Sequence, residues 1–219
     1  MTLDDREWML LEEASAAVPP PAIAPAIGTD ADYPDYISNL LLTVLDLRLR
    51  NPIVNNAIQF YRDNRWNEVR TLEDIEGVLA RFPEDDEGNR AAAKYLWGYL
   101  YADRLGWLRG LVRWARETGL VDQDHLRTWA HASDFERDFS GRVKGLSIAA
   151  YCWLVMRLGV DTVKPDVWVH AFAKRVLGRG LSDVEVVQVI TEAAHRVGRS
   201  ARELDAGIWE HERGGPGTI

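Results

Sequence analysis

The chain has 219 residues, 47% of them hydrophobic, and a formal net charge of −8, so it can form one or two compact domains. Its acidic balance argues against nucleic-acid binding through the overall field, and its single cysteine, Cys152, excludes an internal disulfide framework or an all-cysteine metal site. No run has the length and apolarity of a membrane span and the acidic first residues lack a signal peptide's basic region, so we expect a cytoplasmic protein without membrane contact.

Apolar residues recur at helical spacing along nearly the whole chain, and no run of four or more alternates with period two. We therefore expect an all-α protein. Residues 3–17 form an acidic, amphipathic segment, and the Pro/Ala-rich segment 16–28 is predicted to be an extended linker. The globular part is expected to begin near Tyr33, with Pro34 in the first turn of a helix over 33–51.

Local signals mark the helices that follow. Pro52 suits the first turn of a helix, and Thr71 with Asp74 is typical of an N-cap. Residues 89–118, dense in aromatic side chains, are predicted to form one long helical stretch. The remaining predicted helices run to about Ser133, over 147–157, over 182–197, and from Ser200, where Ser200 and Glu203 form a capping box.

A glycine-containing turn precedes the helix predicted over 147–157. Residues 139–145 supply the first arm and the turn, and the helix supplies the second arm. The backbone N–H groups at the start of a helix point outward and carry partial positive charge, which suits a phosphate oxygen. The turn is therefore a candidate contact for a nucleic-acid backbone.

The turn reads Gly145-Leu146-Ser147, which resembles the Gly-hydrophobic-Gly turn of the helix–hairpin–helix element, with serine replacing the second glycine. After the next apolar helix, Pro165 and Asp166 resemble the loop and helix-start aspartate that follow this element in DNA repair glycosylases. The helix dipole and capping bonds favour the ionised form of such an aspartate.

Two further segments agree in order along the chain. Residues 54–57 read Val-Asn-Asn-Ala, similar to the start of an early helix in the same family, and residues 204–209 match its closing Leu-Asp-x-x-Ile-Trp pattern. Over about residues 33–211 the chain thus resembles the helix–hairpin–helix/Gly-Pro-Asp (endonuclease III-like) superfamily of base-excision DNA glycosylases.

The resemblance implies a two-lobed, all-α glycosylase-like fold with the active-site cleft between the lobes. Residues 1–32 would form an acidic N-terminal helix and a Pro-rich linker, and residues 33–219 would form the domain itself. Within it, lobe A would comprise 33–88 plus 166–212, and lobe B would comprise 89–165 with the hairpin at 139–157.

The resemblance also implies a reaction. Bifunctional members carry a nucleophilic lysine early in the helix after the hairpin, and the matching position here is Ala149. The implied reaction is therefore monofunctional hydrolysis of an N-glycosidic bond in base-excision repair. Asp166 would stabilise the cationic sugar and orient or deprotonate the attacking water. A plain N-cap is the simpler interpretation of Asp166, and Asp161 is the rival acid, interpreted as a loop stabiliser or N-cap.

Residues that contact DNA are expected in the hairpin and its flanks, and basic residues around it favour a local patch. The expected contacts are Arg142, Lys144, Gly145, Leu146, Ser147 and Lys164. A base must leave the stack before cleavage, so a pocket and a plug residue are needed. The candidates are Arg48, Trp107, Trp153 and Trp168. Core packing is the simpler interpretation of most tryptophans, and a solvated arginine is an equally good interpretation of Arg48.

The expected partner is double-stranded DNA with a damaged base, bound by a nucleoid-associated monomer. We expect no cofactor and no multivalent metal, and the resemblance allows a monovalent cation at the hairpin. Two alternatives stay open. One is an N-glycosidase of a free modified nucleoside or nucleotide. The other is a non-catalytic helical module that binds DNA or protein and in which Asp166 is only a cap.

Overall fold

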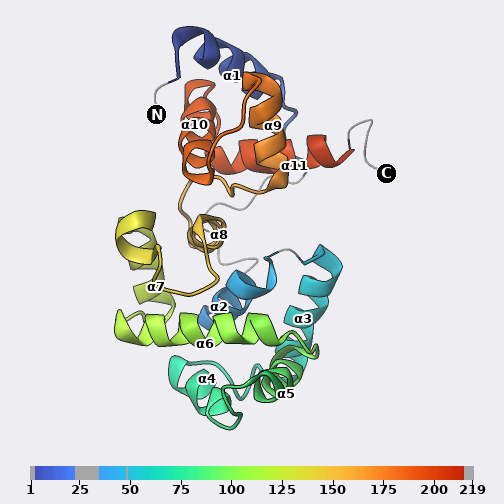
Figure 1. Cartoon of the computed structure of the whole chain (residues 1–219), viewed down its shortest axis with the longest axis vertical. Coiled ribbons are helices and arrows are strands. Elements are labelled where there is room, and N and C mark those ends of the chain that lie inside the picture. The colour runs from blue at the N-terminus through green and yellow to red at the C-terminus, as the bar shows by residue number, and fades with distance from the viewer. Residues whose placement is uncertain (1–2, 23–34, 48, 215–219) are drawn as a thin grey trace. The chain divides into compact units, whose positions relative to one another are not determined.

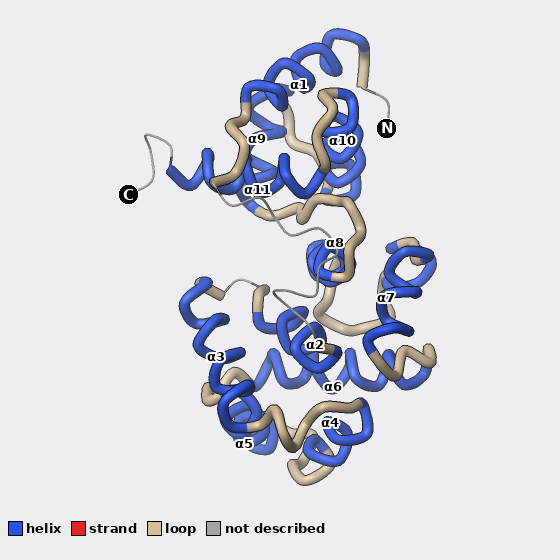
Figure 2. The backbone as a smooth tube through the Cα atoms, turned by 180° about the vertical axis from the view of Figure 1, so that it is seen from behind, coloured by secondary structure: helices blue, strands red, loops and turns tan. Residues whose placement is uncertain are grey.

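The computed structural model describes residues 3–22, 35–47 and 49–214, and within these ranges the regular structure is entirely helical, as Figures 1 and 2 show. The all-α prediction is confirmed. The helices are α1 Asp5–Ala17, α2 Tyr36–Leu45, α3 Asn51–Asn64, α4 Leu72–Leu79, α5 Asp86–Trp97, α6 Ala102–Glu117, α7 Gln123–Ala132, the π-helical turn η1 Phe135–Phe139, α8 Ile148–Arg157, α9 Val167–Leu177, α10 Asp183–Arg196 and α11 Ala201–Gly214.

The chain divides into two compact units. Unit 1 comprises Met1–Thr29 and Gly159–Ile219, and unit 2 comprises Asp30–Leu158. This grouping differs from the expected lobes, because α2 to α5 share a unit with α6 to α8 and not with the C-terminal helices. This grouping follows from the burial of α2, all of whose residues are buried. A helix that is buried on every side needs neighbours all round it, and α2 packs against α3, α6 and α8.

Unit 1 is built from α1, α9, α10 and α11 around one apolar core (Figure 1). The N-terminal helix α1 packs on α9 and α10 and places Leu11 fully inside this core, so it belongs to the unit and is not a separate segment. The guanidinium of Arg199 donates to the carbonyl oxygens of Ser15 (3.2 Å) and Val18 (2.7 Å). Gly207 of α11 allows the close approach of this segment, since an added Cβ would lie 2.6 Å from the Pro19 carbonyl oxygen.

Unit 2 surrounds α2. The buried Arg157 of α8 ties the two helices together: its Nη2 donates to the Asn39 carbonyl (2.9 Å) and to Thr43 Oγ1 (2.6 Å), and its Nε donates to Asn39 Oδ1 (3.1 Å). These bonds satisfy polar groups that burial would otherwise penalise.

Two predicted helices are shorter than the sequence suggests. The stretch over 89–118 is two helices, because Gly98 adopts a left-handed conformation (φ 82°) that ends α5 with its N–H bonded to the Lys94 carbonyl. The helix predicted over 33–51 ends at Leu45, where the Asp46 N–H caps the Leu42 carbonyl. Residues 33 and 34 lie outside the described residues.

The predicted starts of the other helices are confirmed. Pro52 lies in the first turn of α3, and Thr71 and Asp74 form a reciprocal capping box at α4. Ser182 caps α10, and Ser200 exchanges bonds with Glu203 at the start of α11. These signals involve residues two or three positions apart, so the sequence carries them directly.

The loop between α4 and α5 is held by Arg109 of α6, whose side chain is only 8% exposed. Its guanidinium donates to the carbonyl oxygens of Leu79 (3.0 Å) and Phe82 (2.8 Å) and to Asn89 Oδ1 (2.8 Å). On the same helix, Arg113 is 59% exposed and pairs with Glu84 at 3.3 Å.

We expect Arg109→Met to lower the free energy of unfolding by about 3 kcal/mol, because buried acceptors lose charge-assisted hydrogen bonds. Arg113→Met is the matched control and should change stability little, since an exposed ion pair contributes almost nothing. Urea unfolding of both variants measures the difference. Equal losses would show that Arg109 does not hold the loop.

Candidate functional site

Asp166 is the N-cap of α9, with extended backbone (φ −93°, ψ −178°). Its Oδ1 accepts the N–H groups of Trp168 (2.8 Å) and Val169 (3.1 Å), which confirms the N-cap interpretation. Both bonds reach the same oxygen, and within the described part of the chain no residue bonds to Oδ2. The side chain is partly exposed, so one carboxylate oxygen is left for a ligand or a water.

The neighbours of Asp166 offer a partly apolar surface. Pro165 is buried before it, Val167 is 73% exposed after it, and Trp168 is partly buried in the first turn of α9. Trp168, a candidate for the base pocket, therefore lies two residues from the carboxylate on the same helix end.

A second carboxylate, that of Asp205 on α11, is tied to the segment that leads into α9. Its Oδ1 accepts the Lys164 N–H at 3.1 Å, and the Lys164 carbonyl accepts the Asp166 N–H at 2.7 Å. Burial, and next the negative charge of Asp166, raise the pKa of Asp205 to about 7, although the Lys164 N–H bond opposes the rise.

Asp205 is the aspartate of the Leu-Asp-x-x-Ile-Trp pattern, and no role was predicted for it from the sequence. The signal was available in that pattern: Asp205 lies on a helix between Leu204 and Ile208, both fully buried. A carboxylate beside two core positions has to be paired, bonded or protonated.

Asp161 has a structural role. Its two oxygens accept the N–H groups of Ala201 (3.1 Å) and Arg202 (3.0 Å) at the start of α11, and Oδ2 also bonds to His195 Nε2 at 3.0 Å. Burial raises the pKa of Asp161, but the Arg202 N–H, His195 and the Ala201 N–H together hold it below its ordinary value. The interpretation of Asp161 as a loop stabiliser or N-cap is confirmed.

The candidate hairpin lies in unit 2, where Gly145 has a left-handed backbone (φ 88°) and lies against Trp107. A Cβ at this position would come within 2.2 Å of Trp107 Nε1, so only glycine fits. Trp107 is partly buried, and its ring packs against the backbone of the turn at Gly145. Leu146, expected to contact DNA, is 7% exposed and packs inward.

The start of α8 matches the expected anion contact in part. Ser147 is its N-cap, is exposed, and makes no side-chain capping bond. Ala150 and Tyr151 donate their N–H groups to the Ser147 carbonyl. The N–H groups of Ile148 and Ala149 precede this first helical bond, and at the start of a helix such groups have no acceptor within the helix. Lys144, beside the turn, is exposed.

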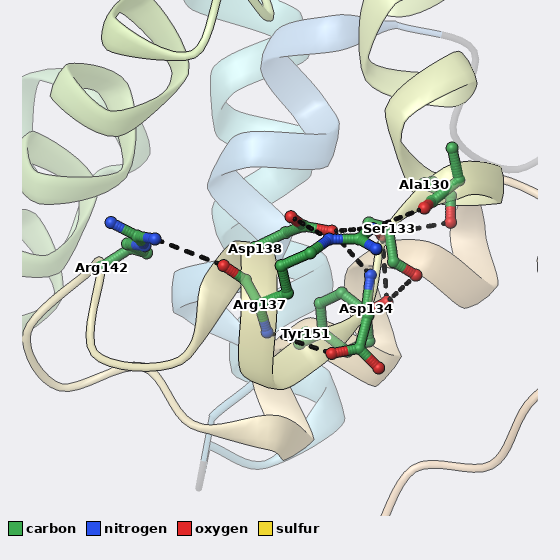
Figure 3. A network of polar contacts seen from close by, with 8 residues as sticks. Ala130, Ser133, Asp134, Arg137, Asp138, Arg142 and Tyr151 are labelled. Carbon is green, nitrogen blue, oxygen red and sulfur yellow. Dashed lines mark hydrogen bonds and ion pairs between the residues drawn. The ribbon is translucent and has the colours of Figure 1, made fainter.

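The first arm of the hairpin is not an α-helix. It is the five-residue π-helical turn η1, held by the polar network of Figure 3. The Tyr151 hydroxyl donates to the Ser133 carbonyl (3.0 Å), Arg137 forms an ion pair with Asp138 (2.6 Å), and Arg142 donates to the Arg137 carbonyl (3.3 Å). The network fixes the turn but engages both arginines.

The expected basic patch is smaller than the sequence suggests. Arg157 is near the hairpin in the sequence, but its side chain is 6% exposed and lies inside unit 2, so it adds no charge to a surface patch. Arg137 is paired with Asp138, and in unit 1 Arg179 is paired with Glu7. Arg142, Lys144 and Lys174 are exposed.

The predicted site residues therefore fall into two groups. Lys164, Asp166 and Trp168 belong to unit 1, and the hairpin, Trp107 and Trp153 belong to unit 2. Trp153 is partly buried, with the Arg157 guanidinium 5.2 Å from its ring centre. The plug candidate Arg48 lies outside the described residues.

Residues 111–213 are similar to the family model described as Domain of unknown function (DUF8548). This range, just under half of the chain, contains the hairpin, Asp166 and Asp205. The match is not to the helix–hairpin–helix glycosylases, so that resemblance stays a prediction. No curated protein and no solved structure matches the chain.

Neither a metal centre nor a membrane span is found in the described part of the chain. No cluster of three or more histidine, cysteine, aspartate or glutamate side chains there has the geometry to hold a metal ion. No described helix is long and apolar enough to cross a membrane.

We expect Gly145→Ala to destabilise the protein far more than Gly141→Ala. Both glycines have positive φ, but nothing lies within 4 Å of a Cβ added at Gly141. The left-handed backbone alone should cost Gly141→Ala about 1 kcal/mol, whereas displacement of Trp107 should bring the cost of Gly145→Ala to about 3 kcal/mol. Thermal unfolding followed by tryptophan fluorescence compares them, and equal costs would contradict the packing of Trp107 against the turn.

We expect Asp205→Asn to stabilise unit 1 at neutral pH but not at pH 4. The folded-state pKa of about 7 is above the unfolded value, so the native state retains a proton that the unfolded state loses. Between about pH 4 and pH 7, wild-type stability should therefore fall by up to about 1.4 kcal/mol per pH unit relative to the variant. Unfolding curves across this range measure the difference, and a constant difference would refute the raised pKa.

Proposed function

We propose that the chain is a monofunctional DNA N-glycosylase with the fold of the helix–hairpin–helix/Gly-Pro-Asp superfamily. In this proposal, water adds to C1′ of a nucleotide, the N-glycosidic bond breaks, and the base leaves with its bonding electrons and takes up a proton. The products are the free base and an abasic site.

The observation that carries the proposal is the arrangement of Asp166. Its Oδ1 is held by two backbone N–H groups, while Oδ2 bonds to no residue in the described ranges. A carboxylate fixed by its own helix end is oriented without losing its negative charge, as stabilisation of a cationic sugar requires. The partly buried Trp168 beside it supplies an aromatic face for a base.

The start of α8 supplies the second element of the proposal. Gly145 lets the turn lie close over Trp107, and the exposed Lys144 adds positive charge next to the uncapped helix start. Backbone N–H groups and a lysine together suit a phosphate of the DNA backbone. Since Ala149 replaces the lysine of bifunctional members, the proposal includes no strand-cleaving step.

We expect Asp166→Asn to lower the cleavage rate by about 100- to 1,000-fold, because the amide keeps the capping bond but removes the charge. The assay uses duplexes with alkylated, oxidised, deaminated or mismatched bases, scored for alkali-labile abasic sites. Asp4→Asn is the matched control, because Asp4 is also an N-cap aspartate of unit 1, bonded to the Glu7 N–H at 2.8 Å.

Asp4→Asn should retain the wild-type rate. If Asp166→Asn cleaves as fast as the wild type, Asp166 is only a cap and the catalytic role fails. If the wild type cleaves none of the duplexes, DNA glycosylase activity fails, and the second candidate is tested on free nucleosides and nucleotides.

That second candidate is an N-glycosidase of a free modified nucleoside or nucleotide. The net charge of −8 favours it, as do the arginines that are bonded to groups of the chain itself, since both weaken attraction to a polyanion. Salt dependence separates the two. Duplex affinity that falls steeply with added salt supports DNA, whereas no duplex binding at low salt supports the small substrate.

A further inference from the structure

One hydrogen bond joins α11 to the segment that precedes α9, and two more continue from that segment into the start of α9. Asp205 Oδ1 accepts the Lys164 N–H (3.1 Å), the Lys164 carbonyl accepts the Asp166 N–H (2.7 Å), and Asp166 Oδ1 accepts the Trp168 N–H (2.8 Å). Pro165, between them, is buried and has no N–H to contribute an alternative bond. The position of the Asp166 backbone therefore depends directly on the Asp205 carboxyl group.

The two carboxylates also interact by charge. Asp166 lies close enough to Asp205 for the negative charge of Asp166 to raise the pKa of Asp205. The helices that carry them, α11 and the start of α9, pack against each other in unit 1 (Figure 2). Asp205 is thus linked to Asp166 in two ways: by hydrogen bonds through Lys164, and by the charge of Asp166 acting on Asp205.

We propose that Asp205 is a positioning residue for Asp166, that it acts through its hydrogen bond to the Lys164 N–H, and that the charge on its carboxyl group modulates the Asp166 site. Its function as a positioning residue rests on the proposed function of Asp166. Neutral or ionised, the Asp205 carboxyl group accepts the Lys164 N–H and fixes the helix start. Loss of its proton adds a second negative charge beside Asp166, which strengthens the field that stabilises a cationic sugar.

Few charged groups face Asp205. Lys164, in the segment before α9, and Arg202, on α11, favour its ionised form, while Asp166 opposes it. His195 of α10 is bonded to Asp161, which holds the start of α11, so His195 is the histidine to replace as a control. His170 of α9 is bonded to Asp183 on α10.

The inference can be tested without a substrate by nuclear magnetic resonance. In the wild type, the Lys164 amide resonance and the Asp166 side-chain carboxyl carbon resonance should both shift with a midpoint near pH 7. Asp205→Asn should remove this transition from both resonances, because the amide still accepts the Lys164 N–H but carries no proton to lose. His195→Gln is the matched control and should leave the transition in place.

Two outcomes overturn the inference. In the first, the transition persists in both Asp205→Asn and His195→Gln. In the second, it persists in Asp205→Asn but is lost in His195→Gln. Asp205→Ala tests the bonded path separately: amide hydrogen exchange at Lys164 should become faster than in Asp205→Asn, and equal rates would also count against it. If Asp205→Ala does not fold, the Asn variant and the histidine control still decide.

Activity on a duplex that the wild type cleaves gives an independent readout. The wild-type rate should rise through pH 7, and the Asp205→Asn rate should match it at pH 6 but lack the rise. Asp205→Ala should lose about 100-fold in kcat with little change in KM, as expected for a misplaced catalytic group. Absence of cleavage by the wild type would defeat the proposed function but not the measured coupling of Asp205 to Asp166.

Discussion

Two carboxylates form reciprocal bonds between the segment that precedes α9 and the helix α11. Asp161, in the segment, accepts N–H groups from the start of α11, and Asp205, on α11, accepts the Lys164 N–H from the segment. Each carboxylate satisfies backbone donors that have no partner within their own element. The start of α9, and with it Asp166, is held from both directions by these bonds.

Unit 2 holds its candidate turn by packing. Gly145 lies on the ring of Trp107, and the first arm is fixed by an aromatic group in which Phe139 contacts Trp114 at a centroid distance of 5.2 Å and Tyr151 at 5.7 Å. The same polar network that rigidifies the turn engages Arg137 and Arg142. The turn therefore keeps a defined backbone, and Lys144 and Arg142 are exposed cations beside it, although Arg142 is bonded to the Arg137 carbonyl.

Local features were predicted well from the sequence. The capping pairs at Thr71 and Ser200, the helix start at Ser182, the N-cap at Asp166 and the all-α class depend on residues within one turn of each other. The break at Gly98 was missed because one glycine in an aromatic helical pattern is tolerated as often as it ends a helix. The grouping of residues 33–88 with the C-terminal helices also differs from the observed units, because amphipathic patterns show that a face is buried but not which helix covers it.

The sequence by itself determined the all-α class, several helix starts with their capping residues, and the placement of a carboxylate at the start of α9. Only the tertiary structure decided which residues from other helices lie near that carboxylate and near the hairpin. The Asp205–Lys164 bond joins residues 41 positions apart, and the Trp107 ring meets Gly145 across two intervening helical elements. Such contacts depend on how whole helices pack. A residue's burial and the charges around it, which set its chemistry, are consequences of that packing and not of its neighbours in the chain.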